Sequence, residues 1–201
     1  MLINTPSRND KTTVKRTGEA GFSMVEMCIA LVILFIGLLA TASSISYALM
    51  VSNRGRSVTN SKLLVMSVLE QMETLRNTKQ LTFGQIANTG AVDNTGADIP
   101  FGGFPTAAQA VSKDPGGDGI FGTADDMTSA GIDGIYGNTN DIPNDPTLAV
   151  PGYSRTIKIE TLSSNIKKIT VTLTYPGMTG SKEKLEVSTY LNNDAQANYI
   201  N

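Results

Sequence analysis

The sequence predicts an α+β protein in which one long N-terminal helix spans a membrane with its first half and packs its second half against a small antiparallel sheet. Three observations predict this fold. Residues 27–40 carry no polar side chain, residues 64–75 repeat apolar residues at helical spacing, and residues 153–191 contain three runs that alternate apolar and polar residues. Helical spacing indicates an amphipathic helix, and alternation indicates half-buried strands.

The apolar run follows a basic segment. Residues 1–21 contain four Lys or Arg against Asp10 and Glu19, so the positive-inside rule predicts that they stay in the cytoplasm. Residues 22–53 then form the helix that crosses the membrane, and everything after it is exported. If residues 23 to about 78 form one helix, it is roughly 84 Å long at 1.5 Å per residue.

One carboxylate, Glu26, lies at the start of the apolar run. An acid at the centre of a bilayer costs on the order of 2.5–3.5 kcal/mol, so Glu26 is expected to have a function and a partner. The expected partner is an amine. If a protease cuts between Gly21 and Phe22, the new α-ammonium group of one copy can neutralise Glu26 of a neighbour when helices bundle.

These residues resemble the start of type IV pilins and pseudopilins. The chain has a basic leader that ends in Gly21, a mature part that begins with Phe22, Glu26 at the fifth mature position, and a continuous apolar run. The resemblance implies a pilin-like fold, cleavage by prepilin peptidase between Gly21 and Phe22, N-methylation of Phe22, and assembly into a helical filament.

Two further segments resemble the PilV-type (type IV pilus modification) minor pilins: Leu69 to Arg76, and the strands at 169–175 and 187–191. The implied function is a minor pilin subunit of a type IV pilus, matured by prepilin peptidase and assembled through its N-terminal helix to prime or modify the filament. The implied partners are the peptidase, other pilins or pseudopilins, and the inner-membrane assembly machinery. The implied location is the inner (cytoplasmic) membrane, in a single pass with the C-terminal domain outside, and then a pilus or periplasmic filament.

Three alternatives stay open. A secretory signal has a similar layout, with Ala40-Thr41-Ala42 as its cleavage site, although its basic region would be 26 residues long. A minor pseudopilin of a type II secretion system has the same helix and head as a minor pilin. A membrane-anchored, calcium-dependent adhesion module would work through the loop region and use the helix only as an anchor.

Charge and composition argue against several other functions. After residue 21 the chain has 12 Lys or Arg and 16 Asp or Glu, a net charge of −4, and no basic patch interleaved with aromatic residues. We therefore expect no nucleic-acid binding, and we interpret Lys167-Lys168 as the solvated face of a strand. The chain has no His and no recognisable catalytic set, so we expect no enzyme activity. Cys28, the only cysteine, can form no intrachain disulfide.

The exported head is predicted in three parts. Residues 54–82 form an amphipathic helix with an apolar stripe that includes Leu64, Val68 and Met72. Residues 153–201 form the antiparallel sheet and a C-terminal tail, with strands at 153–162, 166–175 and 184–191. Residues 83–152 lie between them as a Gly- and Asp-rich loop region, which holds 13 of the 19 Gly and 6 of the 8 Pro. So long a loop is usually functional or disordered.

An internal repeat lies within this loop region, where Asp118 to Asp126 recurs 15 residues later as Asp133 to Asp141. Each copy offers an oxygen ligand, a Gly, an apolar pair and a second oxygen cluster. Ca²⁺ takes six to eight oxygens from such groups, so calcium is the one cofactor that we consider. The alternative is that these residues only form Asx-turns beside Gly. The candidate calcium ligands are Asp114, Asp118, Asp125, Asp126, Asp133, Asn140 and Asp141.

Overall fold

The structure is a computed structural model and describes residues 21–193. The predictions for the leader before Gly21 and for the last eight residues lie outside this described part. The described chain divides into two units, one that ends at Tyr47 and one that begins at Ala48.

A single helix, α1 (Met24–Asn77), confirms the predicted long helix and continues through Gly37 and Gly55. It begins after Ser23, whose hydroxyl accepts the Val25 N–H at 3.3 Å and so satisfies one of the free amides of the first turn. It ends before Lys79, whose φ of 59° is left-handed and lets the chain reverse at the helix end.

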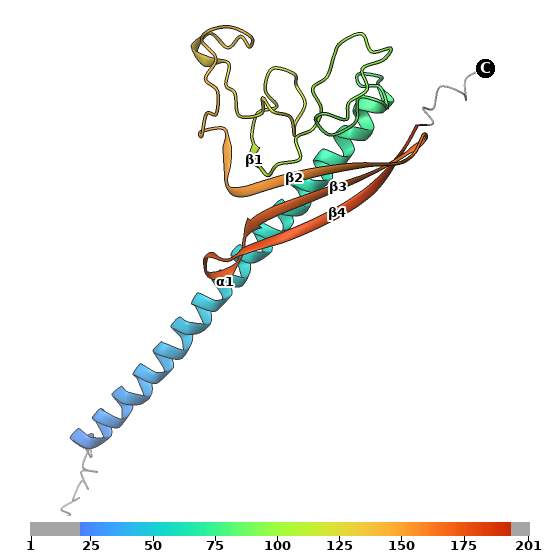
Figure 1. Cartoon of the computed structure of the whole chain (residues 1–201). Coiled ribbons are helices and arrows are strands. Elements are labelled where there is room, and N and C mark those ends of the chain that lie inside the picture. Colours follow the sequence, from blue (N-terminus) through green and yellow to red (C-terminus); the bar gives the residue numbers. More distant parts are fainter. Residues whose placement is uncertain (1–20, 194–201) are drawn as a thin grey trace, which may run out of the picture. The chain divides into compact units, whose positions relative to one another are not determined.

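The sheet of the second unit confirms the predicted α+β fold (Figure 1). Its four strands are all antiparallel and follow the order β1-β2-β3-β4. They are β1 (Gln109–Ser112), β2 (Ala149–Ser163), β3 (Ile166–Pro176) and β4 (Lys182–Asn192). The connection between β3 and β4 contains a short 3-10 helix, η2 (Met178–Gly180).

The core lies between one face of the sheet and the part of α1 that belongs to the second unit. Alternate residues of β2 and β3, such as Ile157, Ile169 and Val171, are almost completely buried there. The helix contributes Ser61, Val65, Val68, Leu69, Met72 and Leu75. These contacts follow from the two periods read in the sequence, because period 3.6 and period 2 each place apolar side chains on one face.

The loop region is more ordered than the sequence indicated. It contains β1, which was not predicted, and a 3-10 turn, η1 (Gly131–Asp133). It also buries Ile86, Phe104 and Ile120 in the core. Sequence periodicity did not reveal these contacts, because each apolar residue enters the core singly rather than as part of a regular run.

Buried Lys167 corrects one half of the interpretation of Lys167-Lys168 as a solvated strand face, because only Lys168 lies on the outer face of the sheet. The Lys167 residue is only 5% exposed, and its Nζ donates to the carbonyl oxygens of Phe83 and Ile86 at 2.6 and 2.8 Å. Burial lowers the pKa of Lys167. The physical reason is strand alternation: Lys167 has the same parity as Ile169, so its side chain lies on the apolar face and fastens the loop to the sheet.

Candidate functional site

The predicted cleavage junction lies just before α1. Gly21 and Phe22 are exposed and have no regular secondary structure, and the Phe22 side chain is among the most exposed apolar groups of the described chain. Glu26 lies in the first turn of α1 and is also exposed. A carboxylate at this position is favoured by the helix dipole, and it is free to meet a group from another chain.

The helix after Glu26 has apolar side chains that nothing in the described chain covers. None of its residues before Ser61 is buried, and Ile33, Phe35 and Leu39 are each more than 60% exposed. The helix is long and apolar enough to cross a membrane, and its most apolar stretch of 18 residues has no buried residue. Cys28 is exposed on the same segment.

The two copies of the repeat fold into the same local turn. In each copy the first Asp, Asp118 or Asp133, accepts the backbone N–H two residues later, at 2.7 and 3.1 Å. In each copy the last Asp, Asp126 or Asp141, accepts the N–H of the second Gly at 2.8 Å. The matching glycines have nearly equal positive φ values, 71° and 69° at the first position and 98° and 89° at the second. The repeat is therefore structural as well as sequential.

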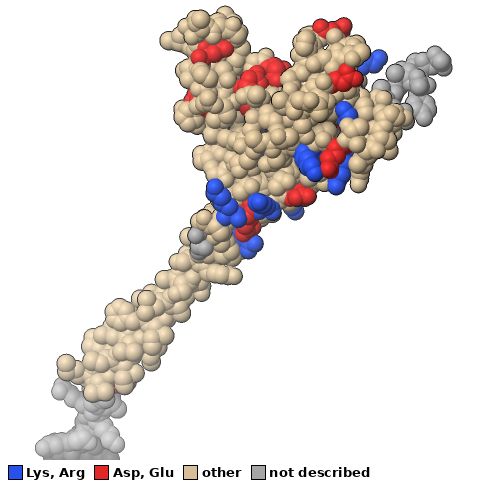
Figure 2. Space-filling model, viewed as in Figure 1, with Lys and Arg blue, Asp and Glu red and all other residues tan. Residues whose placement is uncertain are grey.

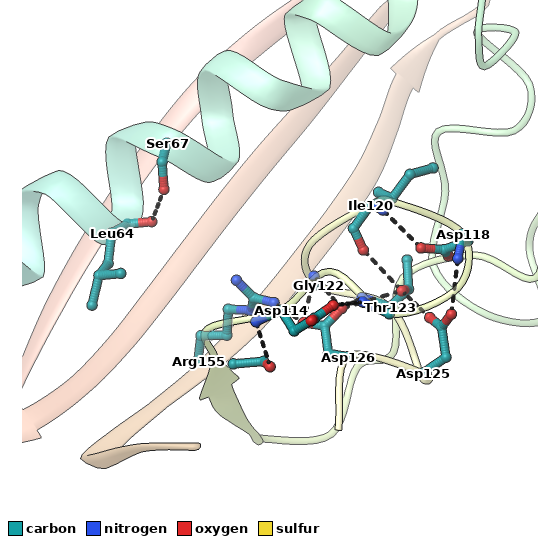
Figure 3. A network of polar contacts seen from close by, with 12 residues as sticks. Leu64, Ser67, Asp114, Asp118, Ile120, Gly122, Thr123, Asp125, Asp126 and Arg155 are labelled. Carbon is teal, nitrogen blue, oxygen red and sulfur yellow. Dashed lines mark hydrogen bonds and ion pairs between the residues drawn. The ribbon is translucent and has the colours of Figure 1, made fainter. Parts of the chain in front are cut away.

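The first copy is anchored in the core by an ion pair. Asp126 accepts hydrogen bonds from the amides of Gly122 and Thr123 and pairs with the Arg155 guanidinium (Figure 3). The side chains of Asp126 and Arg155 are only 2% and 5% exposed. The pKa of Asp126 is raised, because burial of the carboxyl raises it by more than the Arg155 charge and the two amide hydrogen bonds together lower it.

Arg155 is a residue that the sequence reasoning missed. It precedes Ile157 by two residues on β2, so strand alternation places it on the buried face. A buried guanidinium requires a carboxylate partner, so this parity was a signal for a buried ion pair, but it did not indicate which Asp is the partner. The candidate ligand Asp126 is thus placed against Arg155 by the fold.

The second copy extends into solvent. Its apolar Ile135 is 63% exposed, whereas the matching Ile120 is 3% exposed. Asp133 accepts hydrogen bonds from the side-chain amides of Asn138 and Asn140, at 2.9 and 3.1 Å. The hydrogen bond from the backbone N–H of Ile135 is the main cause that lowers the pKa of Asp133, and the hydrogen bond from the Asn140 side chain lowers it further.

Three candidate ligands, Asp118, Asp125 and Asp141, line one shallow hollow between the two copies. Tyr136 also lines it and donates a hydrogen bond from its hydroxyl to Asp114 at 2.8 Å, which brings a fourth candidate close. Partial burial of its carboxyl, with some repulsion from Asp125, raises the pKa of Asp118 to about 6.

One oxygen at this hollow stands out. The Oδ1 atom of Asp141 is buried and accepts no hydrogen bond from the described chain, which is costly for a carboxylate. The side chains as placed do not, within residues 21–193, bring three acidic groups together in a metal-binding arrangement. Calcium therefore stays a prediction, and the hollow is the place that three of the seven candidates line together. The local hydrogen bonds described above are those of Asx-turns, the alternative reading.

A separate groove has Arg155 among its lining residues. Leu64 and Ser67 of α1, Val111 of β1 and Phe121 of the first copy line it as well. The Nε atom of Arg155 is buried without a hydrogen-bond acceptor in the described chain. The buried ion pair thus fastens the first copy to β2.

Comparisons of the chain with models of protein families, with curated proteins and with solved structures find no match.

Proposed function

We propose that this protein is a minor pilin subunit of a type IV pilus, matured by prepilin peptidase and assembled through its N-terminal helix to prime or modify the filament. The observation that carries the proposal is the exposed apolar part of α1 with Glu26 in its first turn. Such a helix requires lipid or other helices around it, and an intramembrane acid requires a partner.

The proposal gives Glu26 and Phe22 complementary roles. In the membrane-stored subunit Glu26 lies near the start of the apolar segment, where its charge is costly. In an assembled bundle the methylated ammonium group of Phe22 on one subunit neutralises Glu26 on a neighbour. The pair has value because a charge taken out of water is strongly destabilising without a partner.

Maturation is tested by mass spectrometry of the protein extracted from membranes. The expected chain begins at methylated Phe22. Replacement of Gly21 by a bulky residue leaves the precursor uncut, because the last leader residue must be small. A chain that begins at Ser43 would instead establish cleavage of a secretory signal after Ala42.

Assembly is tested with Glu26→Ala and Glu26→Gln. Both variants are expected to be cleaved and inserted normally but to be depleted from sheared filaments, because neither has the negative charge that neutralises an ammonium group. Cys28→Ser is the matched control, since it adds a polar group two residues away and leaves Glu26 intact. Wild-type amounts of both Glu26 variants in filaments would contradict the pairing.

The two other candidate functions give different results in the same assay. A minor pseudopilin of a type II secretion system is absent from surface pili, and its loss blocks secretion. An adhesion module that uses the helix only as an anchor stays in the membrane fraction, and its function is insensitive to Glu26→Gln.

A further inference from the structure

Charge is separated within the second unit. From Asp93 to Asp145 there are nine Asp and one base, Lys113, a net charge of −8. The remaining described residues of the unit carry eleven Lys or Arg and five Glu, a net charge of +6. Figure 2 shows this separation, with acidic groups over the loops and basic groups mainly over the sheet and the adjoining helix.

The positive surface is the outer face of the sheet, opposite the core. The strand registers bring Lys168 beside Tyr190 and place Glu160 across from Lys168. The charged residues on this face are Lys158, Lys168, Lys182 and Lys184, with Glu160 and Glu186. Four bases against two acids leave this face, which we call the basic sheet face, with a net charge of +2.

The negative surface is the loop around the second copy of the repeat, residues 131–142, which we call the acidic loop surface. Its Asp133 is exposed to solvent, and Asp141 lies at the hollow. Ile132 is 98% exposed, the highest value among the large apolar residues of the described chain. Ile135 and Ile142 are more than half exposed as well.

Both surfaces therefore combine charge with uncovered apolar side chains. On the basic sheet face Ile166 and Tyr190 are 40% and 64% exposed and lie on the same side as Lys168. Protein interfaces commonly have an apolar centre and a charged rim. Opposite potentials steer two such surfaces together and fix their orientation.

We propose that the second unit binds a second copy of this chain head to tail, with the acidic loop surface of one copy on the basic sheet face of the next. The contact is heterologous, so each pair keeps one free surface of each kind and further copies can add. This inference goes beyond the minor-pilin proposal, because it rests only on surfaces of the second unit and requires no assembly through the N-terminal helix.

The experiment uses the full chain in micelles of a non-ionic detergent, with association measured by sedimentation velocity. The sheet variant is Lys182→Glu with Lys184→Glu. The loop variant is Ile132→Lys with Thr139→Lys, which adds positive charge at two exposed positions and keeps every Asp that forms a turn. The matched control is Lys79→Glu, which changes an exposed base outside both surfaces.

The wild-type chain and the control are expected to associate at low salt, and about tenfold more weakly in 0.5 M NaCl, because salt screens exposed charges. Each variant alone is expected to associate at least about tenfold more weakly than the wild type, because the sheet variant makes the sheet face negative and the loop variant cancels the negative charge of the loop. An equal mixture of the two variants is expected to associate again, since the loop variant keeps its sheet face and the sheet variant keeps its loop.

Recovery in the mixture distinguishes a heterologous contact from a contact between two identical faces. A mixture that stays as monomeric as its components would overturn the proposal. Variants that associate as strongly as the wild type would also overturn it. So would a wild-type chain that stays monomeric at low salt at a concentration about 100 times that used for the variants.

Discussion

The two copies of the internal repeat have the same local conformation but different surroundings. In the first copy, Asp118 to Asp126, Ile120 packs into the core and the last carboxylate, Asp126, forms an ion pair with Arg155. Asp133 to Asp141 exposes Ile135, and one oxygen of its last carboxylate has no hydrogen-bond partner among the described residues. The turn is a local property of the residues, whereas the energetic role of each copy depends on what the fold places beside it.

The largest expected difference between the copies concerns their last Asp. Asp126→Ala leaves the Arg155 charge buried and unpaired, so the free energy of unfolding is expected to fall by about 3–5 kcal/mol. Asp141→Ala removes the matching turn contact to Gly137 in a more exposed place and is expected to cost less than about 1.5 kcal/mol without calcium. Urea unfolding of the full chain in micelles measures both.

A double variant, Asp126→Leu with Arg155→Met, controls for the loss of packing. It is expected to be much more stable than Asp126→Ala, because no unpaired charge remains. If Asp126→Ala and Asp141→Ala cost the same, the copies are equivalent in energy and the ion pair does not distinguish them.

Bound calcium would give the second copy a stabilising role that it lacks without the metal. If calcium binds at the hollow, a concentration of a hundred times Kd is expected to raise the free energy of unfolding by about 2.7 kcal/mol over the value in EDTA. Asp118→Ala and Asp141→Ala are expected to lose this gain, since both residues line the hollow. Asp133→Ala is expected to keep most of it, because Asp133 is not among the lining residues.

Thermal unfolding of the full chain in EDTA and in millimolar calcium measures this gain, with elemental analysis for bound metal. Identical melting in both conditions and no bound metal would reduce the repeat to a pair of Asx-turns.

Glycine replacements test the surroundings of the copies without changing charge. A Cβ on Gly122 would lie 2.6 Å from the Ile157 Cδ1 atom, whereas nothing lies within 4 Å of one on Gly137. Both positions have positive φ, so each Ala costs roughly 1–2 kcal/mol from the backbone. Gly122→Ala is expected to cost about 1–3 kcal/mol more, because of overpacking.

Gly119→Ala and Gly134→Ala are the matched controls, because both glycines have positive φ and open space around the added Cβ. Their costs, measured by the same urea unfolding, are expected to agree within about 0.5 kcal/mol. A Gly122→Ala variant as stable as Gly137→Ala would show that the first copy is not packed tightly against β2.

The smallest expected effect is the pH dependence of Asp118. Because its pKa is raised to about 6 in the folded protein, the folded state binds this proton more tightly than the unfolded state. The contribution is fully present below the unfolded pKa of 3.8 and is lost as pH rises through about 6. Asp118 is an exposed residue, so solvent screening limits the effect to about 1 kcal/mol.

Asp118→Asn removes this titration and keeps an oxygen for the Ile120 amide. In EDTA at pH 7 the variant is expected to be slightly more stable than the wild type, by up to about 1 kcal/mol. In saturating calcium it is expected to be less stable, because a ligand charge is lost. The same sign in both conditions would remove Asp118 from the set of calcium ligands.

Much of the fold could be predicted because it is periodic. The run from Leu64 to Leu75 and the alternation around Ile157 and Ile169 correctly indicated α1 and the last three strands. The loop region could not be predicted in this way. Its buried residues, such as Phe104 and Ile120, have no repeating pattern, and β1 is only four residues long.

The polar parts of the core show the same limit. Lys167 and Arg155 have the strand parity of buried residues, so their positions were readable, but their partners were not. Asn88 is a similar case: its side chain donates to the carbonyl of Ile157 and accepts the amide of Ile159, and so takes the place of a strand partner beside β2. Such partners are distant in sequence and are known only when the chain is folded.

The sequence by itself determined the apolar helix with its early acid, the alternating strands, and the duplicated turn with its glycines, because each depends on residues only a few positions apart. Only the tertiary structure decided that Asp126 faces Arg155, that one oxygen of Asp141 is unpaired within residues 21–193, and that acidic loops and a basic sheet face lie on different surfaces of one unit. These features depend on contacts between residues far apart in the chain, and local spacing carries no information about which distant groups a fold brings together.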